Sequence, residues 1–357
     1  MISKIKYYGF FIVKKIMFLS YLFKAVSFKG LVGEKETDVI IWAPIFSWKY
    51  LIRDRILTDF AYVSSLSKKG MKFYLYFGKN IGKFYNKTIY LAFDFEHNIF
   101  GLGDYTKQLY FIIYELEKQS NLVFPTSKEF LFWENKQFMH EEFNRLNISQ
   151  PRTQIITNFY EVDISKLIFP FLIKEVHSCQ SNGIFKIEKT TDYLSLESRL
   201  VGKVFLIQEL LNMRRDLRVT IVGNSIVHFY WRINNQLEWK PTSTGHGSTV
   251  DFVNFPLMWK DFIICEFLKL NLATGGLDIA WQNDDLTNKP IILEVSPTYQ
   301  LNPVTSDVKH LEKYGVYKKR SIFGINSYLY QYIAQTFVIT DKIVDTRIGK
   351  NNNKVDA

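Results

Sequence analysis

The chain has 357 residues, a length that favours two or three domains over a single core, and its 47% hydrophobic and 17% aromatic content excludes a chain that is disordered throughout. A formal net charge of +10 suits anionic partners such as nucleotides, acidic substrates, nucleic acid or an anionic membrane surface, and does not choose among them. Two cysteines, Cys179 and Cys265, exclude a disulfide framework or a thiolate metal site and favour a reducing cytoplasm.

Residues 1–35 form a basic, aromatic N-terminal segment. Lys14 and Lys15 interrupt its apolar run, so neither a membrane span of about 18 apolar residues nor the core of a signal peptide remains. Two alternatives fit this segment. It is either a helix packed on the body of the protein or a helix lying on an anionic membrane surface.

Residues 36–125 alternate between strand and helix patterns. The expected strands are 37–45, 71–78 and 87–95, and the expected helices are 57–70 and 103–119. Such alternation predicts a parallel sheet with helices packed on it, and therefore a small α/β domain.

The elements expected after residue 125 are more mixed. A helical stretch at 128–148 comes first, and a second helix is expected at 257–271. The expected strands are 170–176, 184–188, 204–211, a hairpin of 216–222 and 226–233, and a last hairpin of 276–282 and 290–296. The final residues, 349–357, have the composition of a loose tail.

The last hairpin carries two carboxylates. If it is symmetric about Leu286, Asp278 lies directly opposite Glu294, with Cβ atoms about 5 Å apart, and Ser296 shares their face. Two carboxylates this close repel unless one is protonated or a cation lies between them. Mg²⁺ suits these hard oxygen ligands. The alternative is that one carboxylate pairs with a buried lysine.

Four basic residues stand out between positions 136 and 232. Lys174 follows an apolar run and precedes a polar loop whose backbone N–H groups could cover a polyanion, although most strand lysines only extend to solvent. Lys136 alone is an ordinary helix lysine. Arg218 and Arg232 lie on the two arms of one hairpin, and whether they share a face depends on the register of the turn. The alternative to a ligand-binding role is that these arginines form ion pairs with neighbours in the sheet.

In order, these segments resemble the ATP-grasp superfamily, in particular the ribosomal-protein glutamyl ligases and the glutathione synthetase-type carboxylate–amine ligases. The matching segments are ENK (134–136), IKEVHSCQSNGIF (173–185), FLIQELL (205–211), RRDLRVTIVG (214–223), GGLDI (275–279) and EVSPTYQ (294–300). Each is weak alone, whereas their order and spacing together are specific, and the resemblance covers roughly residues 100–305.

The resemblance implies an α/β (α+β) protein in which a small parallel α/β pre-grasp domain precedes a two-subdomain ATP-grasp fold. The expected parts are the N-terminal segment 1–35, the pre-grasp substrate domain 36–125, the N-terminal grasp subdomain 126–200, the C-terminal grasp subdomain 201–335 with the Mg-ATP site, and a tail at 336–357.

The resemblance also implies roles for individual residues. Residues implied to bind nucleotide are Lys136, Lys174, Ser181, Gly183, Gln208, Glu209, Leu211 and Asp216. Arg218, Arg232 and Lys240 are implied to be catalytic. Asp278, Glu294 and Ser296 would hold two Mg²⁺ ions, for which Mn²⁺ could substitute. Two departures stand out, because Ser296 replaces the usual Asn ligand and the loop 238–248 lacks the usual arginine.

The implied reaction joins a carboxylate to an amine through an acylphosphate and releases ADP and phosphate. The carboxylate belongs to an amino acid or peptide, or to a sugar such as a surface-polysaccharide precursor. The alternatives are phosphoryl transfer to a hydroxyl and a degenerate nucleotide-binding module. We expect a cytoplasmic protein, and an association with the inner membrane face follows only under the membrane-surface alternative for the N-terminal segment. By analogy it would be a homo-oligomer, and no motif indicates specific nucleic-acid binding.

Overall fold

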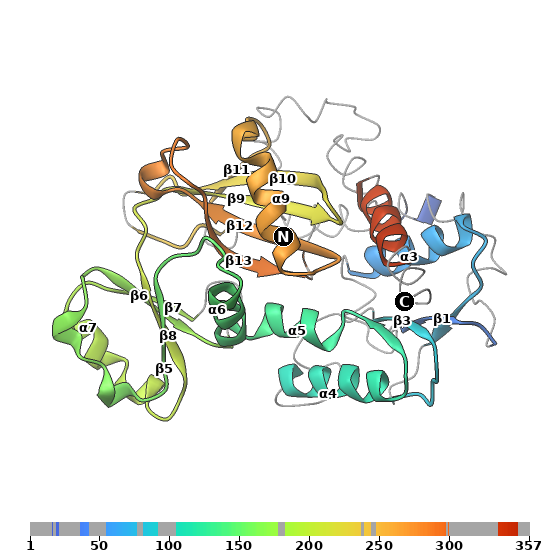
Figure 1. Cartoon of the computed structure of the whole chain (residues 1–357), viewed down its shortest axis with the longest axis horizontal. Helices are drawn as coiled ribbons and strands as arrows, with labels where there is room; N and C mark the ends of the chain where they lie inside the picture. The colour runs from blue at the N-terminus through green and yellow to red at the C-terminus, as the bar shows by residue number, and fades with distance from the viewer. Residues whose placement is uncertain are drawn as a thin grey trace, which may run out of the picture. The chain divides into compact units, whose positions relative to one another are not determined.

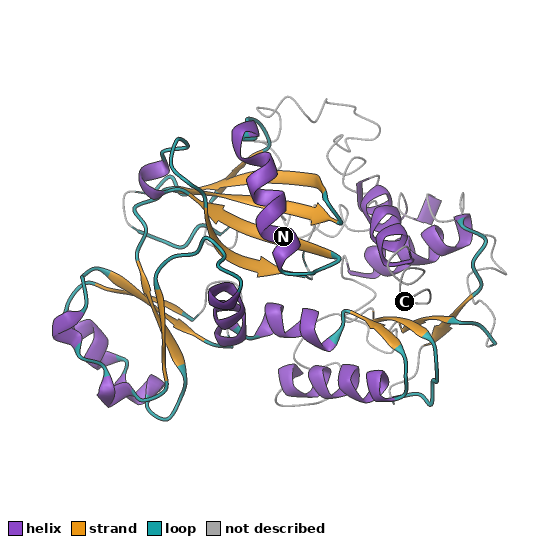
Figure 2. Cartoon of the chain, viewed as in Figure 1, coloured by secondary structure: helices purple, strands orange, loops and turns teal. Residues whose placement is uncertain are grey.

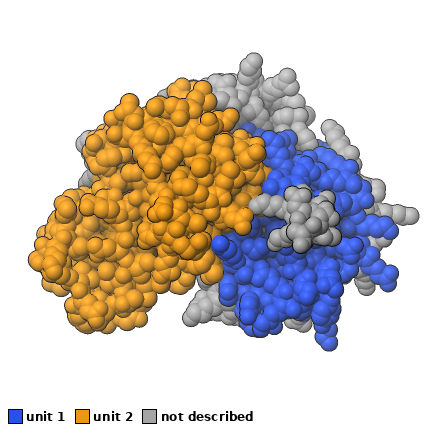
Figure 3. Space-filling model, viewed as in Figure 1, with its two compact units in different colours: residues 1–130, 307–357 blue, residues 131–306 orange. Residues whose placement is uncertain are grey.

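The computed structural model describes residues 16, 19–20, 36–42, 55–76, 81–91, 105–177, 183–236, 239–243, 248–297, 299 and 335–348. The chain forms two compact units, residues 1–130 with 307–357 and residues 131–306 (Figure 3). Among the described residues, no helix combines the length and apolarity that crossing a bilayer requires. Most of the N-terminal segment lies outside the described residues, so both alternatives for it stay predictions.

The first unit contains the predicted parallel sheet, with strand order β2-β1-β3-β4. The strands are β1 (Val39–Trp42), β2 (Phe73–Tyr76), β3 (Thr88–Leu91) and β4 (Leu122–Phe124), and the helices are α3 (Arg55–Lys68) and α4 (Tyr105–Lys118). Every residue of β1 is buried, as expected for a central strand covered on both faces. The α/β character expected for residues 36–125 is therefore confirmed.

The C-terminal region differs from the expectation of a tail at 336–357. Residues 335–348 are helical, and Val344 is buried in the core of the first unit. Arg347 lies over the ring of Phe124 at 4.0 Å and pairs with Glu129 at 3.6 Å. Apolar burial on one face of this segment stabilises a helix that its composition alone does not indicate. The loose tail expected at 349–357 lies outside the described residues.

The second unit begins with a four-stranded antiparallel sheet of order β5-β8-β6-β7. Its strands are β5 (Thr153–Ile156), β6 (Phe171–Glu175), β7 (Ile184–Ile187) and β8 (Phe205–Glu209). The short helices α7 (Thr190–Ser195) and α8 (Glu197–Leu200) lie beside it (Figure 1). Because β8 pairs with both β5 and β6, this subdomain continues to residue 209, and the expected boundary at 200/201 is too early.

A five-stranded antiparallel sheet of order β11-β10-β9-β12-β13 completes the second unit (Figure 2). Its strands are β9 (Arg215–Val222), β10 (Ser225–Ile233), β11 (Thr249–Asp251), β12 (Thr274–Ala280) and β13 (Ile291–Ser296). The helix α9 (Lys260–Lys269) buries Ile263 and Phe267 against one face of the sheet. Strand residues alternate between faces, so the opposite face is left for polar side chains.

The helical stretch expected at 128–148 is two helices, α5 (Ser127–Glu134) and α6 (Lys136–Arg145). Asn135 separates them because its side-chain oxygen accepts a hydrogen bond from the N–H of Phe138 and caps α6. Lys136 is therefore the first residue of a new helix. Its own N–H donates to the carbonyl of Val176 at 3.2 Å, just beyond the end of β6.

Candidate functional site

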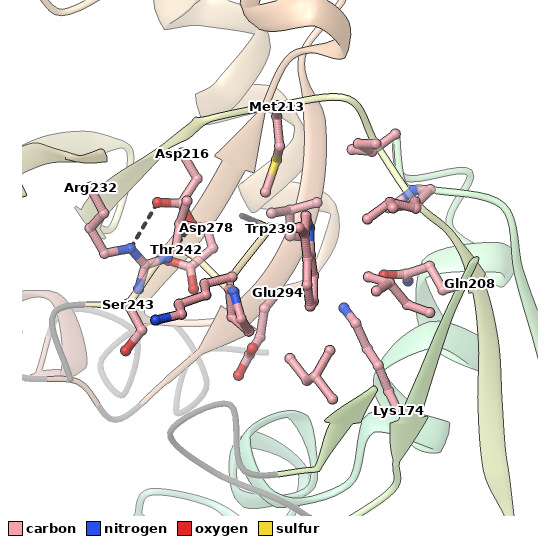
Figure 4. A pocket seen from close by; sticks show the side chains of 18 of the residues that line it. Lys174, Gln208, Met213, Asp216, Arg232, Trp239, Thr242, Ser243, Asp278 and Glu294 are labelled. Carbon is pink, nitrogen blue, oxygen red and sulfur yellow. Dashed lines mark hydrogen bonds and ion pairs between the residues drawn. The ribbon is translucent and has the colours of Figure 1, made fainter. Parts of the chain in front are cut away.

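A pocket in the second unit is lined by residues from both of its sheets (Figure 4). The end of β8 and the residues after it contribute Gln208, Glu209 and Leu211. Lys174 enters from β6, and the five-stranded sheet contributes a set of charged side chains. Residues from two sheets thus meet around one hollow, with an apolar end and a charged end.

Cross-strand register brings the charged residues of the five-stranded sheet into one row. Glu294 on β13 lies opposite Asp278 on β12, as predicted, and Asp278 lies opposite Arg218 on β9. Arg218 in turn lies opposite Tyr230 on β10, and Arg232 is two residues further along the same strand. The structure therefore settles the question of the turn register, because Arg218 and Arg232 share a face.

The hairpin that carries the two carboxylates is not symmetric throughout. Its register runs Asp278–Glu294 on one side of a bulge and Ile279–Ile292 on the other, so Leu293 is an extra residue in β13. Symmetry about Leu286 therefore holds for the pairs on the side of the bulge away from the turn, from Asp278–Glu294 to Gly276–Ser296. As a result, the neighbouring residues Leu293 and Glu294 both line the pocket, which a regular strand would not allow.

The two arginines hold two aspartates in a buried network. Arg218 Nε lies 2.6 Å from Asp278 Oδ1, and Arg232 Nη2 lies 2.9 Å from the same oxygen. Arg232 Nε also donates to Asp216 Oδ1 at 2.8 Å. Burial alone would lower the pKa of Arg232, but Asp216 and Asp278 raise it well above its usual range. Asp216, implied to lie near a ribose, is therefore engaged by Arg232.

Two lysines approach the row from the other sheet and from α6. Burial is the main reason that the pKa of Lys174 falls to about 8, and the charge of Lys136 acts in the same direction, whereas Glu294 and Asp278 oppose the change. Lys136 is buried but does not line the pocket. Lys174 thus feels both carboxylates of the row and the neighbouring charge of Lys136, so two cations lie close to each other at this side of the pocket.

Glu294 differs from the other carboxylates of the row. Among the described residues, no side chain forms a hydrogen bond or an ion pair with it, and Lys174 attracts it only at longer range. A half-buried carboxylate with free oxygens, opposite a second carboxylate, fits a divalent cation such as Mg²⁺. Asp278 fits less directly, since the two arginines already engage its oxygens.

The remaining predicted residues are not all brought into the pocket. Lys240 is exposed and lines it, whereas Ser296 is buried beside Gly276 and does not. Gly183 is buried, and its carbonyl accepts from the N–H of Glu175 at 2.9 Å. Ser181 lies outside the described residues.

The sequence did not indicate several lining residues. Met213, Trp239, Thr242 and Ser243 all line the pocket, and Figure 4 shows Trp239 between the charged row and Gln208. Trp239 could have been found from the sequence, because it directly precedes Lys240, a residue that the resemblance implies to be catalytic. Glu209 lines the pocket, but its carboxylate accepts from the backbone and the guanidinium of Arg152 at 2.8 and 2.9 Å. Its N–H also donates to the carbonyl of Arg152 at 3.0 Å, so its backbone carbonyl is the group left to serve a ligand.

No protein-family model matches the sequence, and no curated protein matches it. Solved structures do. A RimK domain ATP-grasp protein from Sphaerobacter thermophilus matches 86% of this chain and 99% of its own, with 11% identity and a TM-score of 0.51. D-alanine–D-alanine ligase from Bacillus anthracis, solved with ATP, matches 86% of this chain and 99% of its own, with 12% identity and a TM-score of 0.52.

The ATP-grasp ligase PsnB, solved with a minimal precursor, matches 84% of this chain and 99% of its own, with 13% identity and a TM-score of 0.50. At such low identity the likeness concerns the fold alone. The parallel sheet of the first unit and the two antiparallel sheets around the pocket of the second agree with it. The chain therefore has the ATP-grasp fold.

Proposed function

We propose that this protein binds ATP with Mg²⁺ in the described pocket and uses it to join a carboxylate to an amine. The observation that carries the proposal is the convergence of charge. Lys174, on one sheet, lies near Glu294 and Asp278, on the other, and Arg218 and Arg232 complete the row. The arginines and aspartates of the row offset one another's burial cost, whereas Lys174 is buried and forms no ion pair among the described residues, as expected of a group that serves a ligand.

The charge balance of the pocket supports a metal-bearing nucleotide. Its lining carries the cations Lys174, Arg218, Arg232 and Lys240 and the anions Glu209, Asp216, Asp278 and Glu294, four of each. A neutral lining does not attract a free triphosphate. It does accept one whose charge divalent cations neutralise. Glu294 and Asp278 would hold these ions, and Mn²⁺ could substitute for Mg²⁺. Ser296, two residues after Glu294, would be the third metal ligand. The ions would neutralise charge on the phosphates.

The remaining roles follow from position. Lys174 and Lys136, with the loop that contains Ser181 and Gly183, would bind the phosphates. Gln208, Glu209 and Leu211 would contact the base, and Glu209 would do so through its backbone. Asp216 would lie near the ribose and keep Arg232 in place. Arg218, Arg232 and Lys240 would contact the reacting groups.

In the proposed reaction an oxygen of the substrate carboxylate attacks the γ-phosphorus of ATP. The bond from that phosphorus to the bridging oxygen breaks, and ADP leaves. The amine then attacks the acyl carbon of the resulting acylphosphate, phosphate leaves, and the amine loses a proton. Arg218 and Arg232 stabilise the transferred charge, because buried guanidinium groups held by aspartates are preorganised for it.

We propose an amino acid, a peptide or a sugar acid as the source of the carboxylate. The name D-alanine–D-alanine ligase describes the joining of two amino acids, and PsnB was solved with a minimal precursor. Amino acids and peptides are therefore the natural first substrates to test. The sugar acid extends that set to surface-polysaccharide precursors, where the basic N-terminal segment would hold the protein at an anionic membrane.

The test is ADP release from Mg-ATP with pooled candidate carboxylates and amines, followed by trapping with hydroxylamine. An acylphosphate gives a hydroxamate, whereas phosphoryl transfer to a hydroxyl does not. Glu294→Gln is the matched control, because it keeps the side-chain shape and removes the charge. Substrate-dependent ADP release with hydroxamate, lost in Glu294→Gln, supports the ligase. Substrate-dependent ADP release without hydroxamate favours the phosphotransferase, and nucleotide binding without any turnover favours a degenerate module.

A further inference from the structure

A buried histidine that the proposed chemistry does not use lies behind the pocket. His140 is on α6, the helix that begins with Lys136, and its side chain is 0% exposed. Its Nδ1 lies 2.6 Å from Gln150 Oε1, and its Nε2 lies 3.5 Å from Gln208 Nε2, at the long limit of a hydrogen bond. His140 thus connects a residue of the pocket wall to polar groups outside the pocket.

The direction of each hydrogen bond between Thr153, Gln208 and His140 follows from one fixed acceptor, the carbonyl of Pro151. The Pro151 carbonyl can only accept, and the Thr153 hydroxyl donates its single proton to it at 2.9 Å. Thr153 Oγ1 can therefore only accept from Gln208 at 2.8 Å, so the Gln208 atom facing it must be the amide nitrogen. This assignment does not depend on the histidine.

The assignment continues through His140. The second N–H of the Gln208 amide points to His140 Nε2, which must then carry a lone pair. The proton of the neutral ring is consequently on Nδ1, where it is donated to Gln150 Oε1. Gln150 donates in turn from its amide nitrogen to Asn144 Oδ1 at 2.7 Å. Each of these bonds thus has one donor and one acceptor.

The ionisation of His140 agrees with this chain. Burial is the main reason that the pKa of His140 falls to about 4, and the charges of Lys174 and Lys136 act in the same direction, while the bond to Gln150 opposes the change. The ring is therefore neutral at pH 7, as an acceptor at Nε2 requires.

The consequence is a fixed orientation of Gln208. Both N–H groups of its amide face away from the pocket, toward Thr153 and His140. Its carbonyl oxygen has no hydrogen-bond partner among the described residues, and the side chain lines the pocket (Figure 4). The wall at the base end of the pocket thus presents an acceptor, which needs a donor from the ligand.

We propose that His140 is a positioning residue that, with Thr153, holds the carbonyl oxygen of Gln208 toward the pocket and so selects a base with an exocyclic amine over one with a carbonyl at that edge. This inference rests on the proposed nucleotide site and deepens it. Adenine offers an N–H donor there, whereas guanine would place an oxygen against an oxygen. A buried acceptor left without a donor costs about 1–3 kcal/mol, or about 5–150-fold in affinity.

The experiment compares the dissociation constants of Mg-ATP, Mg-GTP and the magnesium complex of tripolyphosphate, measured by isothermal titration calorimetry on the full chain. The variants are His140→Phe, which keeps a ring but removes the acceptor, and Thr153→Val, which keeps the shape but removes the hydroxyl. His140→Gln is the conservative variant, because its side-chain oxygen can replace Nε2. Thr153→Val tests the proposal even if His140→Phe does not fold.

We expect wild type to prefer ATP over GTP, and His140→Phe and Thr153→Val each to reduce this preference by about tenfold or more, without changing the affinity for tripolyphosphate. His140→Gln should restore most of the preference. Equal loss of affinity for all three ligands would mean a merely structural role and overturn the inference, as would an unchanged preference. If wild type binds tripolyphosphate but neither nucleotide, the inference fails. If it binds none of the three, the proposed function fails with it.

Discussion

Replacing Lys174 with methionine would separate the cost of a buried charge from its use in binding. Lys174 is 9% exposed, and its pKa falls from 10.5 to about 8, mainly through burial. Each pKa unit corresponds to about 1.4 kcal/mol, so keeping Lys174 protonated at pH 7 costs the folded protein roughly 3 kcal/mol. Methionine has a similar length and no charge. We therefore expect Lys174→Met to raise the free energy of unfolding without nucleotide by up to roughly 3 kcal/mol at neutral pH.

The effect should depend on pH with a definite sign. Between pH 8 and 10.5 the unfolded chain keeps a proton on Lys174 that the folded protein has released, so the stability of wild type rises with pH across this window. The methionine variant lacks this titratable group, so its stability does not rise with pH in this way. At about pH 9.5 its advantage should therefore shrink to roughly 1 kcal/mol.

Urea unfolding of both proteins at neutral pH and at the higher pH measures this difference, and calorimetry with Mg-ATP measures binding. The affinity for Mg-ATP should fall by about 10–100-fold, because a charge-assisted contact to phosphate is lost. Lys186→Met is the matched control. Lys186 lies on the neighbouring strand β7 and pairs with Glu188 near the surface, where such pairs contribute about 1 kcal/mol or less. A destabilised Lys174→Met protein, or an effect that does not change with pH, would refute the reasoning.

Further predictions concern the buried ion network. Asp216→Asn should lower the free energy of unfolding by about 3 kcal/mol in urea titrations, because Arg232 loses its bidentate partner in a buried site, and an unchanged midpoint would contradict a buried pair. In Gly276→Ala the new Cβ would lie 2.8 Å from Arg218 Nη1 and push the guanidinium from Asp278, so ADP release should fall at least about tenfold. Gly275→Ala should show the reverse, a loss of about 1–3 kcal/mol with activity retained, since its Cβ would meet a Phe267 ring carbon in the core at 2.8 Å. Equal behaviour of the two alanine variants would argue against a role for Arg218.

Pattern arguments predicted the elements well where periodicity is strong. Alternating strand and helix patterns indicated the parallel sheet, and the spacing of Asp278 and Glu294 indicated their pairing. The extra residue Leu293 was not predictable, because a bulge leaves no trace in the period of a short strand. The helix break at Asn135 had a signal in the sequence, an Asn that can cap, but helical spacing continues on both sides of it.

The charged residues show a different limit. Sequence spacing placed Arg218 and Arg232 on one hairpin, but the turn register that puts them on one face is set by backbone pairing. Ion pairing of the arginines with sheet neighbours was the alternative, but their partners, Asp216 and Asp278, were each predicted to serve a ligand. A role implied by resemblance describes one residue at a time, whereas a buried charge is governed by all of its neighbours.

In the proposed function, Glu294 belongs to a site for a metal-bearing nucleotide. Thermal unfolding with and without Mg-ATP, on wild type and on Glu294→Gln, tests it most directly. At a concentration of about a hundred times the dissociation constant, Mg-ATP should add about 2.7 kcal/mol to the stability of wild type and much less to that of Glu294→Gln. No stabilisation of wild type at millimolar Mg-ATP, or equal stabilisation of both proteins, would contradict the account.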